Sequence, residues 1–306
     1  MKLVHAIVGP TGIGKSKLGL LLARTLDAEI VNADSRQIYR YMDIGTAKPG
    51  PEERASIPHH LIDIADPDED FSLALYQSLA CATVEDIMQR GKLPVLIGGS
   101  GLYIWAILEG WNIPQVPPNP DFRRRMEQRA SVEGVEALYH HLESIDPVTA
   151  GRMNPRNLRR IIRALEIYEA THSPPSQVQG KTPPRFDTLI VGLTTGRERL
   201  YEMIDRRVDD MIGRGLVEEV KSLVDRGYGF DLPSMSSVGY RQIGRYIQGE
   251  LDLSTAIQQI KFETHRFARH QYAWFRLTDP RIRWFDIQDN IEENVLHLVN
   301  EKIGLQ

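Results

Sequence analysis

The stretch Gly9-Pro10-Thr11-Gly12-Ile13-Gly14-Lys15-Ser16 decides the fold of this chain. An apolar run, Leu3–Val8, precedes it, and a segment with leucines at helical spacing follows it. Strand, glycine loop and helix in this order are typical of a phosphate-binding loop, in which backbone N–H groups and the positive end of the helix surround an anion. The flanking strand and helix disfavour the alternative, a chance glycine-rich turn. We expect these eight residues to bind a phosphate chain, with a point charge from Lys15 and Mg²⁺ on the Ser16 hydroxyl.

Composition narrows the classes of function. With 306 residues the chain can bury a large core, and its formal net charge of −4 gives no overall basic field for nucleic acid. Any such contact therefore needs a local basic surface. The single cysteine, Cys81, excludes an intramolecular disulfide and a cysteine-rich zinc site, and we expect it to be buried. No apolar run is long enough to span a membrane, and the first strand begins almost at once. We expect a cytoplasmic protein without a targeting peptide or a membrane partner.

Short β-like runs recur along the chain, and helical segments lie between several of them. This alternation predicts an α/β fold, with a P-loop NTPase-like parallel sheet wrapped by helices. The runs are Leu3–Val8, Glu29–Ala33, His60–Ile64, Pro94–Gly98, Thr188–Thr194 and Ile282–Asp286.

Two proline-rich segments interrupt this rhythm. The first spans residues 113–120, and the second contains two double prolines between residues 173 and 184. A helical, charge-rich region lies between them. We expect a core domain of residues 1–113 and 187–306, which ends in helices, and a helical insertion domain of residues 114–186 that acts as a lid.

Two polar segments follow predicted strands and should lie beside the phosphate-binding loop, because ligands bind beyond the carboxyl ends of parallel strands. Asp34 could bind Mg²⁺ or accept a proton from an attacking group, although a helix N-cap explains it equally well. In Gly98-Gly99-Ser100-Gly101, the glycines permit close backbone approach and Ser100 offers a hydroxyl. A loop that lines the substrate site is favoured over a plain turn.

Arginines dominate two later segments. Five of them between Arg152 and Arg163 recur at steps that would form one basic stripe on a helix, with no acidic residue before Glu166. This pattern favours phosphate binding over a solvated charged face. A second basic helix spans about residues 254–276, where we expect the Trp274-Phe275 pair in the core. His265 and His270 would lie on its polar face and not bind metal.

For two further segments, a role at the site and a purely structural role are both open. The segment Ser236–Gln242 suits a loop that touches a nucleotide, and a surface turn explains it almost as well. Arg206 and Arg207 could reach the phosphate site from across the cleft, or form salt bridges with nearby acidic residues.

Together these segments resemble the tRNA dimethylallyltransferases, also called tRNA isopentenyltransferases. The similarity covers residues 3 to about 276. The matching stretches are GPTGIGKS (9–16), NADSRQIYRYMDIGTAKP (32–49), PHHLID (58–63), GGSGLY (98–103), RRIIRALEIY (159–168), GLVEEV (215–220), VGYRQ (238–242) and WFR (274–276). This combination is far more specific than the phosphate-binding loop alone.

The resemblance implies transfer of a dimethylallyl group from dimethylallyl diphosphate to N6 of adenosine 37, next to the anticodon of a tRNA. The loop Gly9–Ser16 would then bind the substrate's diphosphate, with Mg²⁺ on Ser16, and Asp34, Ser100 and Arg207 would be catalytic. The family usually has threonine where this chain has Ser100. The resemblance also implies a bacterial-type enzyme without a C-terminal zinc finger. We expect a monomer. It assigns contacts with the tRNA anticodon stem-loop to Asp34, Ser35, Arg36, Gln37, Ser100, Arg123, Arg159, Arg160, Arg163, Tyr240, Arg241, Gln242, Arg266 and Arg269.

Three rival functions share parts of this pattern. An adenylate isopentenyltransferase would use a free nucleotide as acceptor, which the arginine-rich insertion disfavours. A P-loop kinase of small metabolites would use Asp34 as a base and the insertion as a lid. An RNA-binding module with an inactive phosphate loop is disfavoured, because Lys15, Ser16 and Asp34 are all present.

Overall fold

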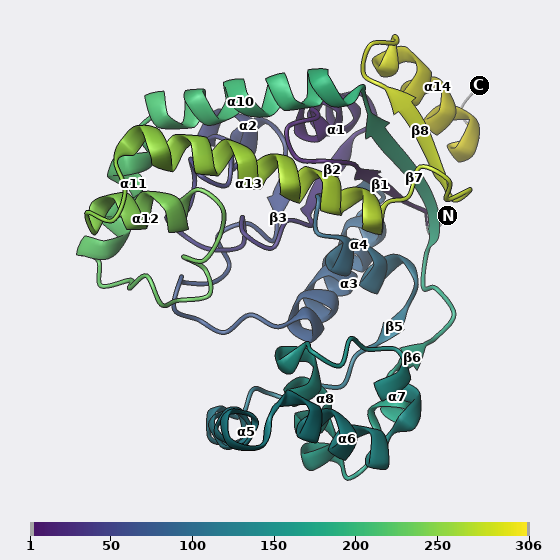
Figure 1. Ribbon diagram of the computed structural model, residues 1–306. Coiled ribbons are helices and arrows are strands. Elements are labelled where there is room, and N and C mark those ends of the chain that lie inside the picture. Colours follow the sequence, from purple (N-terminus) through teal and green to yellow (C-terminus); the bar gives the residue numbers. More distant parts are fainter. Residues whose placement is uncertain (1–2, 305–306) are drawn as a thin grey trace. The chain divides into compact units, whose positions relative to one another are not determined.

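The computed structural model describes residues 3–304, which form two compact units (Figure 1). The larger unit contains the chain up to Ser72, together with Tyr76–Leu108 and the chain from Arg185 onwards. The smaller unit contains Glu109–Pro184 and the short piece Leu73–Leu75. None of the helices between residues 3 and 304 has both the length and the apolar character that a bilayer span requires.

A six-stranded parallel sheet forms the centre of the larger unit and confirms the predicted α/β class. The strand order is β3-β2-β4-β1-β7-β8, so the first strand lies inside the sheet with β4 and β7 as neighbours. Strands occur at five of the predicted positions, but the third prediction, His60–Ile64, is confirmed only at His60, because β3 spans His59–His60. Their bounds are β1 Leu3–Val8, β2 Ala28–Asn32, β3 His59–His60, β4 Leu93–Ile97, β7 Asp187–Thr194 and β8 Ile282–Asp286.

The inner strands are buried on both faces, as their nearly continuous apolar sequences require. Every residue of β1 and β2 is buried. Side chains of a strand alternate between the two faces, so Leu3 and Ile7 join the core cluster that includes helix α1 (Lys15–Thr25). That helix packs closely at Gly19, where an added Cβ would lie 2.0 Å from Cδ1 of Ile97.

Helices surround this sheet, and two of them run side by side on one side of the unit in Figure 1, α10 and α13. Cys81 lies in α3 and is buried, as predicted. Besides α1, the helices of the larger unit are α2 Pro51–Ser56, α3 Leu73–Gln89, α4 Gly101–Leu108, α10 Arg197–Gly213, α11 Leu216–Asp225, α12 Tyr240–Ile247, α13 Leu253–Trp274 and α14 Ile291–Ile303.

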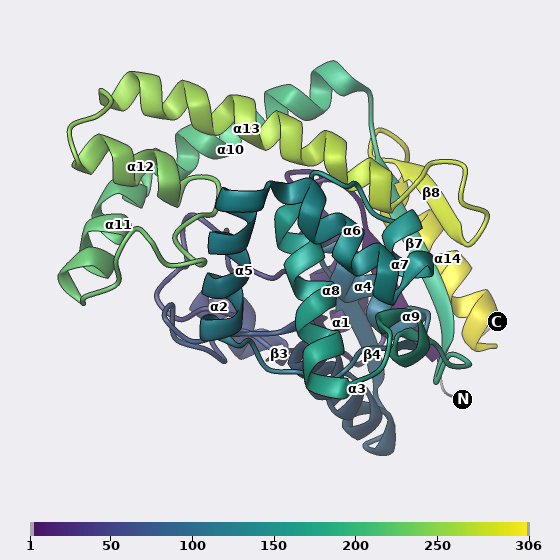
Figure 2. The same cartoon turned by 60° about the horizontal axis from the view of Figure 1, so that its bottom comes forward.

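The smaller unit is mainly helical and has its own apolar core. In Figure 2 its helices α5, α6 and α8 lie close together, and they contribute Phe122, Leu138, Leu142, Ile161 and Leu165 to that core. Two short antiparallel strands bring the ends of the unit together. The elements are β5 Trp111–Asn112, α5 Pro120–Glu133, α6 Val135–Ile145, α7 Pro147–Gly151, α8 Leu158–Thr171, α9 Pro175–Val178 and β6 Gly180–Lys181.

The predicted single stripe of five arginines is wrong. Helix α7 ends at Gly151 and α8 begins only at Leu158, after Asn157, whose side chain accepts a hydrogen bond from the backbone N–H of Arg160. Arg152 and Arg156 therefore lie outside α8. Only Arg159, Arg160 and Arg163 are on this helix.

The arginines are also not all unpaired. Glu166 is 2% exposed, and its carboxylate accepts hydrogen bonds from Arg123 at 2.8 Å and from Arg163 at 2.5 Å. Burial alone would raise the pKa of Glu166, but the hydrogen bonds from Arg123, the Asn119 backbone and Arg163 lower it. These two arginines thus stabilise the smaller unit by compensating a buried carboxylate.

Gly98, directly after β4, packs closely against the backbone of a neighbouring segment. An added Cβ there would lie 2.0 Å from the carbonyl oxygen of Ala33, which is backbone and cannot rotate away. We expect Gly98→Ala to lower the free energy of unfolding by at least about 2–3 kcal/mol, as overpacking of a tight site does. Chemical denaturation measures this change.

Gly213→Ala is the matched control, because no atom lies within 4 Å of an added Cβ at this exposed helical glycine. It should leave stability unchanged or raise it slightly. Equal effects of the two substitutions would contradict the packing of β4 against β2.

Candidate functional site

The site forms where three loops leave neighbouring parallel strands at the same edge of the sheet. The glycine-rich loop Gly9–Gly14 follows β1, the Asp34 turn follows β2, and Gly98–Ser100 follows β4. Backbone hydrogen bonds join the last two loops, from Ala33 N to Ile97 O at 2.7 Å and from Ser100 N to Ala33 O at 3.3 Å. The sequence prediction that these segments lie beside one another is confirmed.

The first loop has the conformation that a phosphate cradle requires. Gly9, Gly12 and Gly14 all have positive φ angles, of 138°, 82° and 99°, which L side chains rarely adopt. Gly14 is the N-cap of α1, so the N-terminus of this helix adjoins the loop. Ile13, by contrast, is 1% exposed and belongs to the core, where it anchors the loop.

Lys15 folds back over the loop. Its Nζ donates hydrogen bonds to the carbonyl oxygens of Gly9 at 3.0 Å and Pro10 at 2.9 Å. Burial and then the nearby Arg207 lower the pKa of Lys15 to about 7, and the Asp34 carboxylate opposes them. The charged form of Lys15 is therefore disfavoured at this position, and a bound anion would stabilise it.

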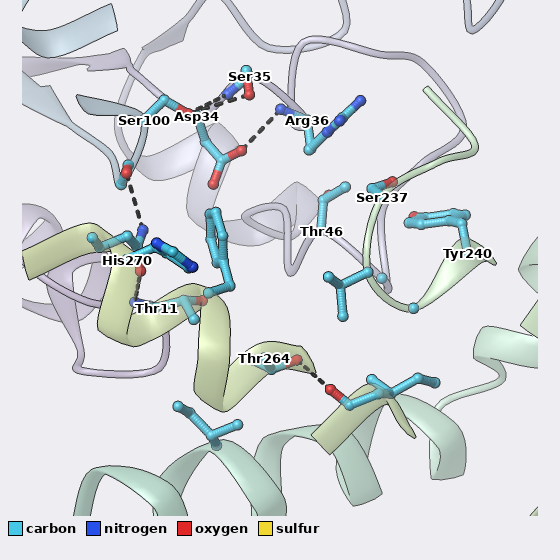
Figure 3. A pocket seen from close by; sticks show the side chains of 18 of the residues that line it. Thr11, Asp34, Ser35, Arg36, Thr46, Ser100, Ser237, Tyr240, Thr264 and His270 are labelled. Atoms are coloured by element: carbon cyan, nitrogen blue, oxygen red, sulfur yellow. Dashed lines mark hydrogen bonds between the residues drawn. The ribbon is translucent and has the colours of Figure 1, made fainter. Parts of the chain in front are cut away.

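Asp34 caps a turn, and not a helix, because no helix follows it until Pro51. Its Oδ1 accepts a hydrogen bond from the backbone N–H of Arg36 at 2.9 Å, and its own N–H donates to Asn32 Oδ1 at 3.0 Å. These contacts fix the side chain, whose carboxylate points into the pocket in Figure 3. The turn therefore presents a carboxylate as a proton acceptor or cation ligand.

Ser100 supports this turn. Its Oγ accepts a hydrogen bond from the backbone N–H of Ser35 at 3.0 Å and donates to Ser35 Oγ at 3.2 Å. Other parts of the protein pack closely against the three glycines around Ser100, where a side chain would not fit. An added Cβ would lie 2.0 Å from Ala33 O at Gly98, 2.1 Å from Gln271 Nε2 at Gly99, and 2.3 Å from Trp274 Cγ at Gly101.

A cavity of about 420 Å³ opens between these loops and helices α10 and α13. Thr11, Asp34, Ser100 and Arg207 contribute its polar wall. Burial lowers the pKa of the Arg207 guanidinium, and the Asp34 carboxylate opposes this effect. Apolar side chains line much of the rest, namely Leu102, Tyr103, Ile204, Val208, Met211, Val238, Ile260, Phe267 and Trp274.

Part of the apolar wall is exposed to solvent, which corrects one expectation. Phe275 is fully buried as predicted, but Trp274 is 42% exposed and lines the cavity, so this residue is not in the core. Phe267 is 47% exposed on the same helix, and His270 lines the cavity beside it. An apolar surface that faces a charged phosphate cradle suits a ligand with one ionic and one apolar end.

Some of the predicted residues line the cavity, and others are not among its lining residues. Arg206 lies near Glu202, at 3.7 Å, and only its neighbour Arg207 reaches the site. Of the residues expected to contact tRNA, Asp34, Ser35, Arg36, Ser100 and Tyr240 line the cavity. Arg123, Arg159, Arg160 and Arg163 belong to the smaller unit.

The segment Tyr240–Gln242 is the start of α12, where we expected a loop. Tyr240 is fully buried and donates a hydrogen bond to Glu219 at 2.6 Å, and Gln242 accepts one from the backbone N–H of Gly239. Arg241 is exposed and lines a second cavity. These contacts give Tyr240 and Gln242 structural roles.

Three more of the predicted contact residues lie outside the cavity wall. Gln37 donates hydrogen bonds to the carbonyl oxygens of Thr46 and Ala47 and so holds the loop that carries Thr46. Arg266 and Arg269 are exposed on α13, and Arg269 donates to the Tyr201 hydroxyl at 2.5 Å.

Sequence reasoning missed two residues that organise the site. Gln271 connects two of its loops, and Glu219 accepts three backbone N–H bonds, from Asp43, Ile44 and Gly45, besides the Tyr240 hydroxyl. Glu219 thereby holds the loop that carries Thr46. Only the position of Gln271, one helical turn before Trp274, could have indicated that it faces the same cavity.

No group of three or more metal-ligating side chains from His, Cys, Asp and Glu occurs within residues 3–304. The exposed Ser16 hydroxyl at the start of α1 and the Asp34 carboxylate remain as ligands from the chain itself. This small set fits Mg²⁺, which is usually bound by one or two protein oxygens together with substrate phosphates and water.

Comparisons with known proteins agree with one another. The IPP transferase family model matches residues 37–278, and the isopentenyl transferase model matches residues 2–66. A tRNA dimethylallyltransferase of Roseiflexus castenholzii is 55% identical over 271 residues, which cover 89% of both chains. One of Thermomicrobium roseum is 50% identical over 286 residues, which cover 94% of this chain and 87% of that protein.

Solved structures are similar over nearly the whole chain. A tRNA isopentenylpyrophosphate transferase of Bacillus halodurans has a TM-score of 0.73 and 40% identity, and the match covers 100% of this chain and 97% of that one. A eukaryotic dimethylallyltransferase described as acting on tRNA has a TM-score of 0.81 and 27% identity, with 98% and 78% coverage.

The lowered pKa of Lys15 predicts that its charged side chain lowers the free energy of unfolding of the ligand-free protein. Its pKa of about 7 in the folded chain lies below its ordinary value of 10.5, so the unfolded chain binds an additional proton between these pH values. The cost is fully present below pH 7 and declines as pH rises through this range. Lys15→Met should therefore raise the melting temperature at pH 6, and by a smaller increment at pH 9.

Lys17→Met is the control, because this neighbouring side chain is 84% exposed. Thermal unfolding of the free proteins should show no such pH-dependent gain for it. An increment for Lys15→Met that stays constant from pH 6 to pH 9 would contradict the buried cation.

Proposed function

Because this chain belongs to the IPP transferase family, we propose that it transfers a dimethylallyl group from dimethylallyl diphosphate to N6 of adenosine 37 in tRNA. One observation carries the proposal: Thr11 of the phosphate-binding loop and Asp34 line one cavity, and the rest of that cavity is largely apolar. A prenyl diphosphate has an anionic end and an apolar end that match these two surfaces.

The donor's diphosphate binds to the loop Gly9–Ser16. Backbone N–H groups at the N-terminus of α1 hold its oxygens, and Lys15 turns from the carbonyl groups of Gly9 and Pro10 to the anion. Arg207, which is half-buried and lines the cavity, contributes a second cation. When Mg²⁺ is bound through Ser16, it neutralises part of the charge on the leaving diphosphate.

The acceptor's exocyclic amine is a weak nucleophile, and Asp34 supplies the base that it needs. N6 attacks C1 of the dimethylallyl group, the N6–C1 bond forms, and the C1–O bond to diphosphate breaks. The proton on N6 passes to the Asp34 carboxylate, and the electron pair of the C1–O bond leaves with the diphosphate. Lys15 and Arg207 stabilise the charge that develops on this leaving group.

The apolar wall protects the reacting carbon. Allylic carbon with a partial positive charge reacts readily with water, and Leu102, Phe267 and Trp274 present hydrocarbon in place of bound water. Adenosine must leave the base stack of the anticodon loop to enter such a cavity, and it is then read as a flipped base.

We propose that the helical insertion of residues 114–186 contacts the tRNA. Arg159 and Arg160 are exposed at the start of α8 and are available to phosphates. Arg123 and Arg163 already compensate Glu166, so a contribution from them to tRNA binding would be additional to their structural role.

The acceptor separates this proposal from the use of a free nucleotide. Purified protein is incubated with dimethylallyl diphosphate, Mg²⁺ and either an anticodon stem-loop with adenosine at position 37 or AMP. Mass spectrometry of the nucleosides should find the five-carbon addition at that adenosine and none on AMP. Prenylated AMP together with an unmodified stem-loop would overturn the proposal.

Asp34→Asn tests the proposed base directly. The amide keeps the size of the side chain but cannot accept the N6 proton, so we expect kcat to fall by a factor of about 10² to 10⁴. Binding of tRNA, measured by filter retention, should change little. Asp187→Asn, at an exposed carboxylate at the start of β7, is the control and should keep full activity. Unchanged turnover of the Asp34 variant would exclude it as the base.

A further inference from the structure

One side chain connects the two loops that the proposed reaction uses. Gln271 on α13 is 3% exposed. Its Oε1 accepts a hydrogen bond from the backbone N–H of Thr11 at 2.7 Å, and its Nε2 donates to the carbonyl oxygen of Gly99 at 3.0 Å. These partners are 260 and 172 residues away in the sequence. A single amide group thus joins the phosphate-binding loop to the glycine loop after β4.

The connection continues to the proposed base. Ser100, which follows Gly99, accepts a hydrogen bond from the backbone N–H of Ser35, and Ser35 follows Asp34 directly. Thr11 lies in the loop that holds the donor's diphosphate. The separation between diphosphate and base therefore depends, beyond the sheet itself, on a short series of contacts to which α13 contributes Gln271.

The chemistry of the contact explains why glutamine occupies this position. Thr11 requires an acceptor and Gly99 requires a donor, and an amide supplies both from one planar group. A glutamate carboxylate would accept from Thr11 but would present an oxygen to the Gly99 carbonyl. The glycine at position 99 is equally constrained, because an added Cβ would lie 2.1 Å from Gln271 Nε2.

We propose that Gln271 is a positioning residue for prenyl transfer, which sets the distance between the donor's reacting carbon and the Asp34 carboxylate by fixing the two loops. This inference rests on the proposed function. It assigns Gln271 no contact with substrate and no share in the proton transfer. Its effect is on the alignment of groups that do react, where small displacements reduce the rate strongly.

Gln271→Met removes both hydrogen bonds and keeps an unbranched side chain of similar length. We expect kcat to fall by a factor on the order of 10², as misplacement of reacting groups produces. The KM for dimethylallyl diphosphate should change much less, because Lys15, Arg207 and the other loop amides still bind the anion. A residue that served only stability would lower the melting temperature and leave kcat of the folded protein unchanged.

Hydrogen–deuterium exchange of the ligand-free chain gives a second readout that needs no turnover. In wild type, the Thr11 N–H is bonded to Gln271, so its exchange should be several-fold faster in Gln271→Met. Gln271→Glu keeps the acceptor for Thr11 and loses the donor to Gly99. In this variant the Thr11 amide should remain protected, while kcat still falls.

Gln288→Met and Gln288→Glu are the controls at an exposed glutamine after β8, and they should match wild type in both assays. The inference is overturned if Gln271→Met keeps the wild-type kcat, if its Thr11 amide exchanges as in wild type, or if Gln271→Glu is fully active. Wild-type protein that prenylates no stem-loop would overturn the proposed function instead, and the exchange experiment would still decide whether Gln271 holds the loop.

Discussion

The geometry of the site depends on one constraint, the common direction of β2, β4 and β1 in the sheet. Because the three strands are parallel neighbours, their carboxyl ends lie at one edge, where backbone hydrogen bonds join the Asp34 turn to the glycine loop after β4. The sheet therefore brings the phosphate cradle, the Asp34 turn and the glycine loop together, and the Gln271 side chain joins the first of these loops to the last. Helices α10 and α13 close the cavity from the other side with Arg207, Gln271 and Trp274.

This arrangement concentrates opposite charges in a poorly solvated space. Lys15 and Arg207 both have lowered pKa values because they are buried, and the Asp34 carboxylate partly offsets this effect for each. Two cations that are costly in the free protein are well suited to a ligand with several negative charges. A bound anion beside these two cations would favour their charged forms.

The sequence predicted the elements whose signals are local. Five of the six strands of the sheet, the phosphate-binding loop and the position of Asp34 followed from apolar runs, glycines and the rule that ligands bind at the carboxyl ends of strands. These features depend on residues within one loop or on neighbours in the same element. The family resemblance added Arg207, whose position within α10 does not itself distinguish it from Arg206.

Features that depend on distant partners could not be predicted. Gln271 and Thr11 are 260 residues apart, and nothing in the pattern of α13 marks that amide. The predicted arginine stripe is wrong because Asn157 caps a new helix that begins at Leu158, and because Glu166 is turned inward to Arg123, which lies 43 residues earlier. Trp274 was placed in the core because it is apolar, but Gly101 provides a surface on which it packs at the cavity wall.

A dual-label experiment distinguishes a phosphate-binding loop that binds a prenyl diphosphate from one that binds ATP. Dimethylallyl diphosphate labelled in its hydrocarbon and ATP labelled in its terminal phosphate are offered separately with tRNA lacking the modification. We expect hydrocarbon label to enter the tRNA with release of one diphosphate per group, and ATP to transfer nothing. Phosphate transfer from ATP, with no hydrocarbon label in the tRNA, would contradict this expectation.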